Sequence, residues 1–140
     1  ALASGATIVT NTREIAADDY FQGMFTTALE EGEIVTAVSF PVPEKAHYEK
    51  FVQPASRFAL VGVFVAKYAD GVRVAVTGAS NDGVHRWAAA EEALSANFSA
   101  DALADLTVPA DDLISDLHGT AEYRAHLVKV MTQRAVTAAA

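Results

Sequence analysis

The sequence predicts an α+β fold in which helices pack on one face of an antiparallel sheet of about three strands. Segments rich in β-branched residues occupy the chain up to about residue 80, whereas Ala, Glu and Leu recur at helical spacing after Gly83. The pair Asp70-Gly71 separates two apolar runs, a pattern typical of a hairpin turn. Because the predicted strands come first along the chain and the helices follow, the order favours an α+β fold over an alternating α/β fold.

The first 43 residues predict short elements. Asp18 is expected to cap a helix that Gly23 ends, and Pro41 cannot donate to a strand ladder, so a strand should stop there. The expected elements are a strand over 6–10, an extended piece over 11–15, a helix over 17–25 and a strand over 31–43.

Three longer strands, over 46–53, 58–69 and 72–79, are expected to form the sheet. Helices are predicted over 84–98, 99–106 and 120–140, with Thr120 as the cap of the last. Its apolar stripe is expected to comprise Tyr123, Leu127, Val130, Met131 and Arg134.

Composition excludes several classes of function. The 140 residues are 51% hydrophobic and 20% charged, which suits one globular domain, or one domain with a piece of another. Ten basic residues face eighteen acidic ones, for a net charge of −8, so a phosphate-binding nucleic-acid surface is not expected. The chain has no cysteine, which excludes disulfides and thiolate metal sites within it.

The first residues lack both an initiator methionine and a basic region, so we do not expect them to be a signal peptide. We expect the chain to begin partway through a longer gene product. No apolar run reaches the roughly 18 residues that a membrane span needs.

No catalytic constellation stands out. The Gly-rich stretch over 77–87 lacks the Lys and Ser/Thr of a phosphate-binding loop and is interpreted as a strand-to-helix turn. Ser56 has no nucleophile elbow around it, and the four histidines do not form a metal-ligand pair. The unusual segment is 48–57, which carries Lys50 and Arg57 at the edge of a predicted strand and suggests a ligand or partner there.

Several segments together resemble one family. Residues 13–43, "REIAADDYFQGMFTTALEEGEIVTAVSFPVP", resemble the end of the FAD-binding domain in the medium (flavoprotein) subunit of carbon monoxide dehydrogenase-like molybdenum hydroxylases, the xanthine dehydrogenase family. "YEKFVQPASRFALVGVFVA" and "HGTAEYRAHLVKVMTQRAV" resemble the start and the closing helix of that subunit's C-terminal domain. The resemblance implies a remnant of the FAD-binding domain over 1–43 and the C-terminal domain over 44–140.

The resemblance implies a multi-subunit oxidoreductase of the cytoplasm. A large subunit would hold molybdopterin, a small subunit would hold two [2Fe-2S] clusters, and the medium subunit would hold FAD and pass electrons to an external acceptor. The Gly-rich loops that bind the FAD pyrophosphate in the family have no counterpart in this sequence, so this part alone should show no turnover.

The resemblance also implies cofactor-binding residues. Ile34 and Val35 would be apolar contacts to the flavin ring system. Lys50 would place positive charge near a ring that becomes anionic on reduction, and Phe58 would cover the ring, with Ser56 and Arg57 in the same loop. Two alternatives stay open: a subunit-docking domain without a direct flavin role, and a stand-alone small-molecule binding module.

Overall fold

The structure is a computed structural model that describes residues 1–140. Its main sheet has four antiparallel strands in the order β6-β7-β8-β9. The long β7 and β8 pair through residues 62–68 and 71–77 and meet at the hairpin that Asp70-Gly71 predicts. The strands are β6 (Lys45–Val52), β7 (Ala59–Tyr68), β8 (Gly71–Ser80) and β9 (Gly83–Arg86). The α+β prediction is therefore confirmed, with one strand more than expected.

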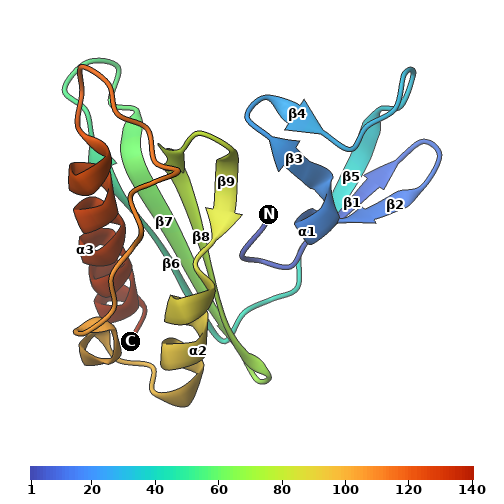
Figure 1. Ribbon diagram of the computed structural model, residues 1–140. Coiled ribbons are helices and arrows are strands. Elements are labelled where there is room, and N and C mark those ends of the chain that lie inside the picture. Colours follow the sequence, from blue (N-terminus) through green and yellow to red (C-terminus); the bar gives the residue numbers. More distant parts are fainter.

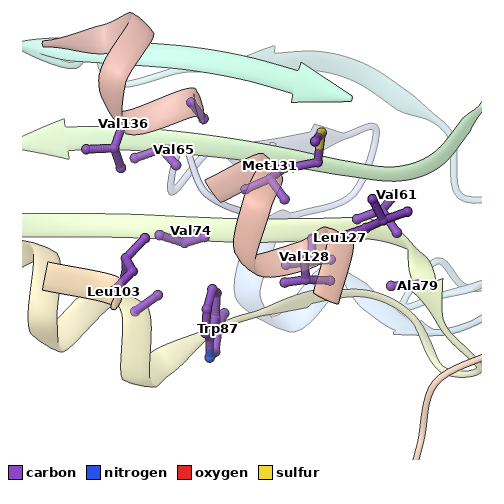
Figure 2. Packing of buried hydrophobic residues seen from close by; sticks show 14 of the residues in the cluster. Val61, Val65, Val74, Ala79, Trp87, Leu103, Leu127, Val128, Met131 and Val136 are labelled. Carbon is purple, nitrogen blue, oxygen red and sulfur yellow. The ribbon is translucent and has the colours of Figure 1, made fainter. Parts of the chain in front are cut away.

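Helices cover one face of this sheet, as Figure 1 shows. Alternate residues of the central strands, such as Val65 and Val74, point into a core of 18 buried residues that also includes Leu103 and Met131 of the helical elements (Figure 2). Burying one such side chain contributes about 1.5–3 kcal/mol, so this core is the main source of stability. The helical elements are α2 (Ala88–Ala96), the 3₁₀ turn η1 (Ala100–Leu103) and α3 (Ala121–Ala139).

The N-terminal residues form smaller elements beside the other face of the sheet (Figure 1). One sheet has the order β2-β1-β5, and β3 pairs with β4 as a separate hairpin. A small core of Ala6, Ile8, Ile15 and Ala17 holds them together. The elements are β1 (Thr7–Thr10), β2 (Glu14–Ala16), α1 (Ala17–Tyr20), β3 (Phe21–Gly23), β4 (Thr26–Thr27) and β5 (Val35–Ser39).

Several local predictions were wrong. The helix expected over 99–106 is only the 3₁₀ turn η1. The helix expected over 17–25 ends at Tyr20, and its N-cap is Ala16, without a side-chain bond. The helix expected from residue 84 starts at Ala88, because residues 83–86 pair with β8 instead. In α3 the buried residues are Arg124, Leu127, Val128, Met131, Thr132, Ala135 and Val136.

The shift of the α3 stripe has a packing cause. Arg124 is buried because its guanidinium bonds the carbonyl oxygens of Leu60 and Gly78 and the carboxylate of Asp116. Tyr123, which pattern alone places in the core, is 41% exposed and meets Phe51 edge-on instead. Thr120 caps α3 as predicted, since its hydroxyl accepts from the Tyr123 N–H.

Asp18 joins the N-terminal part to the main sheet. Its carboxylate accepts from Arg73 of β8 at 2.6 Å and from Arg86 of β9 at 3.1 Å. Arg86 also pairs with Glu91 of α2 at 2.6 Å. Burial acts to raise the pKa of Asp18, but the two arginines lower it more, so the pKa lies below its ordinary value.

Glu33 ties the β1–β2 turn to the segment before β5. It accepts from Arg13 Nε at 2.9 Å, from the Glu30 N–H at 2.8 Å and from Thr10 Oγ1 at 2.7 Å. These hydrogen bonds, that of Arg13 first, hold the pKa of Glu33 far below its ordinary value of 4.5.

Acid should therefore destabilise the fold through Glu33. A carboxylate whose pKa is lowered by folding stabilises the folded state above its unfolded pKa, near 4.5, and that contribution is lost as pH falls below it. We expect the melting temperature of the wild type to fall more steeply between about pH 5 and pH 3 than that of Glu33→Gln. Thermal melts of both proteins across this range measure the difference, and parallel curves would contradict the role of Glu33.

Candidate functional site

The turn between β6 and β7 brings four of the six predicted site residues together. The N–H of Gln53 donates to the carbonyl of Phe58 at 3.0 Å and closes a short loop. Lys50, on β6, reaches this loop because its Nζ donates to the carbonyl of Arg57 at 3.2 Å. Ser56 and the side chains of Lys50 and Arg57 are exposed at the end of the sheet.

The backbone of this turn is strained. Ser56 and Arg57 both have left-handed conformations, with φ of 57° and 54°. Non-glycine residues in this region cost of order 1 kcal/mol or more each, and such residues concentrate at functional sites. Two consecutive left-handed residues fix the direction in which the Arg57 and Phe58 side chains leave the turn.

Phe58 is the last residue of the turn, directly before β7. The residue is 42% exposed, and its ring meets the His118 ring edge-on, with centroids 5.5 Å apart. His118 belongs to the segment before α3, where Asp116 accepts from both the His118 N–H and Arg124. The buried Arg124 thus anchors the segment against which Phe58 packs. Sequence reasoning missed this contact because 60 residues separate the two rings.

Ile34 and Val35 lie apart from these four residues. Val35 begins β5, in the small N-terminal sheet, and Ile34 directly precedes it. Ile34 exchanges hydrogen bonds with Asn11: its N–H donates to Asn11 Oδ1 at 2.9 Å, and its carbonyl accepts from the Asn11 N–H at 3.1 Å. The two side chains are 65% and 40% exposed. The six predicted residues therefore form two groups on two different sheets.

The sheet has an open face, which we define by Tyr48, Gly62, Phe64, Ala75 and Thr77, opposite the helices. Lys50 lies on this face as well, because it is two residues from Tyr48 on β6 and pairs in register with Gly62. A Cβ at Gly62 would collide with the Tyr48 hydroxyl, so glycine is what lets the Tyr48 side chain reach over β7. Burial raises the pKa of Tyr48 above its ordinary value.

A mostly apolar cavity of about 650 Å³ lies between the open face and the N-terminal elements. Phe21 and Phe40 form part of its N-terminal side, together with the first four residues. None of the six predicted site residues lines it. Because alternate residues of a strand point to opposite faces, the sequence could have shown that Tyr48 and Phe64 share the open face. Nothing in the sequence shows that Phe21 and Phe40 approach this face.

No family model matches the chain. It is 33% identical to the carbon monoxide dehydrogenase medium chain of Afipia carboxidovorans, over 89% of this chain and 47% of that protein. It is 34% identical to the nicotine 6-hydroxylase medium subunit of Paenarthrobacter nicotinovorans, over 94% of this chain and 50% of that protein. The chain is homologous to the medium chains of carbon monoxide dehydrogenase-like molybdenum hydroxylases.

The structure agrees with this homology to medium chains. A chain in the crystal structure of quinoline 2-oxidoreductase from Pseudomonas putida 86 superposes with a TM-score of 0.77 and 25% identity. The superposition covers 99% of this chain and 53% of that one. The chain spans about half the length of the curated relatives it matches. None of the helices combines the length and the apolar composition that a membrane-spanning helix requires.

Proposed function

We propose that this chain is part of the FAD-binding medium subunit of a molybdenum hydroxylase, in which it forms part of the flavin ring pocket. The observation that carries the proposal is homology over about nine-tenths of the chain to medium chains of three differently named oxidoreductases. The clustering of Lys50, Ser56, Arg57 and Phe58 at one turn supports it further.

The β6–β7 turn has groups that fit a flavin ring. A flavin ring is flat and apolar on its faces and carries hydrogen-bond acceptors along one edge. The exposed ring of Phe58 offers an aromatic surface, while Lys50 and Arg57 offer cationic donors. We propose that the left-handed backbone of Ser56 and Arg57 holds the Arg57 and Phe58 side chains in place. We also propose that Lys50 stabilises the turn through its hydrogen bond to the Arg57 carbonyl.

Ile34 and Val35 are proposed as apolar contacts to the same cofactor from the N-terminal sheet. Their exposure, 65% and 40%, leaves apolar surface available for such a contact. The chain contains no Gly-rich phosphate-binding loop, so we place the pyrophosphate site in the half of the medium chain that lies outside this sequence. We also propose that this part alone shows no turnover.

In the proposed enzyme, bound FAD would take electrons from iron–sulfur clusters and pass them to an external acceptor. The partners would be a molybdopterin-binding large subunit and an iron–sulfur small subunit, in the cytoplasm. The role of this chain is to hold positive charge at Lys50 and Arg57 and an aromatic surface at Phe58. The cysteine-free composition suits a subunit that holds no iron–sulfur cluster itself.

The role of Lys50 predicts a change in flavin reduction potential. Removing its charge in Lys50→Met should lower the potential by roughly 20–40 mV, because about 1–2 kcal/mol of stabilisation of the anionic reduced ring is lost. The measurement is a redox titration of the flavin-loaded medium subunit. Lys45→Met is the matched control, since Lys45 is an exposed lysine of the same strand on the other face. Equal shifts in the two variants would contradict a specific role for Lys50.

Docking to a partner subunit is the second candidate function. Leu117, in the segment before α3, is 91% exposed, and Tyr123, in the first turn of α3, is 41% exposed. Exposed large apolar side chains are typical of protein–protein contact surfaces. If docking is the main role, Leu117→Asp should break the complex and leave flavin bound, while Lys50→Met should leave the potential unchanged.

A further inference from the structure

We infer that two copies of this chain associate through β6, whose free edges pair antiparallel about a two-fold axis at His47 and join the two main sheets. The partner is thus a second copy of the same chain. This inference concerns β6 and α3 and does not depend on flavin binding.

β6 has a free edge, because it pairs with β7 on one side and with no strand on the other. In an antiparallel pair, the N–H and C=O groups of alternate residues point to the neighbouring strand, and those of the residues between them point away. The N–H of Gln53, directly after β6, faces β7, since it donates to the carbonyl of Phe58 at 3.0 Å. By this alternation, the backbone groups of Ala46, Tyr48 and Lys50 point outward and can bond to another strand.

The side chains along this edge favour one register. In a two-fold pair with its axis at His47, Lys45 of each copy lies opposite Glu49 of the other. Opposite charges at such positions stabilise a pair of strands, and like charges destabilise it. An axis one residue earlier would set Lys45 against His47, and an axis one residue later would set it against Phe51. An axis at Glu49 would bring two carboxylates together.

Lys45 has no carboxylate partner within its own chain. It forms no ion pair there, and its neighbour in register on β7 is another cation, Lys67. Charged side chains on a sheet edge ordinarily oppose the addition of a strand. In the two-fold pair, Glu49 of the second copy supplies the missing carboxylate. On the open face, the same register sets the small Ala46 opposite Tyr48, which is 46% exposed.

α3 adds a helix contact to the strand pair. It packs over β6 and β7 to a similar extent, so its axis lies between these strands. With neighbouring strands about 4.8 Å apart, the two copies of α3 would lie about 10 Å apart, a distance at which helices pack. Tyr123 marks the β6 side of α3, because its ring meets Phe51. Residues seven and eleven positions after Tyr123 lie on the same side.

This side of α3 has an open hollow that a second α3 would cover. The hollow has a volume of about 400 Å³ and is lined by Val130, Gln133, Arg134, Thr137 and Ala138.

A charge swap tests the inference. The full-length medium subunit is prepared without flavin, and its mass is measured by sedimentation equilibrium over a range of concentrations. We expect the wild type to approach twice its monomer mass. Lys45→Glu sets carboxylates opposite each other and Glu49→Lys sets ammonium groups opposite each other, so each should raise the dimer dissociation constant at least ~10-fold. The double variant, Lys45→Glu with Glu49→Lys, restores opposite charges and should regain the association of the wild type.

Glu92→Lys is the control for net charge. Glu92 is an exposed residue of α2, away from β6, and its replacement changes the net charge as Glu49→Lys does. It should leave the dissociation constant unchanged.

Amide hydrogen exchange locates the contact. The N–H groups of Ala46 and Tyr48 should exchange more slowly in the wild-type dimer than in Lys45→Glu, since pairing gives them acceptors. A wild type that stays monomeric at every concentration would overturn the inference. So would a dimer that neither single substitution weakens, or a double variant that fails to associate. None of these results depends on whether flavin binds, so a failure of the flavin proposal leaves this test intact.

Discussion

Replacing Arg124 with alanine is expected to lower the free energy of unfolding by about 3–5 kcal/mol. Arg124 is 3% exposed and donates to the carbonyls of Leu60 and Gly78, both at 2.8 Å, and to Asp116 at 2.8 Å. In Arg124→Ala, the carbonyls of Leu60 and Gly78 lose their hydrogen-bond donor beneath α3, and a cavity opens where the guanidinium lay. Urea denaturation, followed by circular dichroism, measures the loss.

Two further variants separate the parts of this effect. Arg134→Ala removes an exposed arginine from the same helix and should change stability by less than about 0.5 kcal/mol. Asp116→Asn keeps both carbonyl bonds of Arg124 and should cost clearly less than Arg124→Ala, since the Asp116 side chain is 37% exposed. A loss as large in Arg134→Ala as in Arg124→Ala would refute the anchoring role.

Gly78→Ala is expected to cost about 2–5 kcal/mol. Gly78 has φ of +78°, and an added Cβ would lie 2.7 Å from the carbonyl oxygen of Ala59 and 2.8 Å from that of Leu60. These are backbone atoms of a central strand and cannot move aside without disturbing β7. The same carbonyl of Leu60 accepts from Arg124, so a shift there would also weaken the anchor of α3.

Gly32→Ala is the matched control for Gly78→Ala. Gly32 has nearly the same φ, +77°, but nothing lies within 4 Å of an added Cβ. It should show only the left-handed penalty of about 1 kcal/mol. The difference between the two variants, measured by urea denaturation, isolates the collision with β7. If both variants lose the same stability, the collision contributes nothing.

The sheet and α3 could be predicted because their local signals agree with their packing. Asp70-Gly71 between two apolar runs specifies a hairpin, and Thr120 specifies the start of a helix, whatever surrounds them. β9 could not be predicted. Residues 83–86 form a strand only because β8 offers its edge, and "VHR" before an alanine-rich run has the local character of a helix.

The candidate site was only partly predictable for the same reason. Lys50, Ser56, Arg57 and Phe58 lie within nine residues, so a local pattern sufficed to place them together. The contact of Phe58 with His118 depends on tertiary packing, as does the separation of Ile34 and Val35 from the turn. Arg124 was expected neither in the core nor near the site, because a charged residue is buried only where specific partners meet it.

The flavin proposal is tested most directly by absorbance near ~450 nm, where bound flavin absorbs. The spectrum is recorded on two proteins after incubation with FAD and gel filtration: this chain, and the same chain continued to its natural start. We expect only the longer protein to retain the yellow cofactor, because the pyrophosphate site is proposed to lie upstream and the ring contacts at the β6–β7 turn. If neither protein retains flavin, the proposed roles of Lys50 and Phe58 are wrong, and a subunit-docking domain becomes the better account.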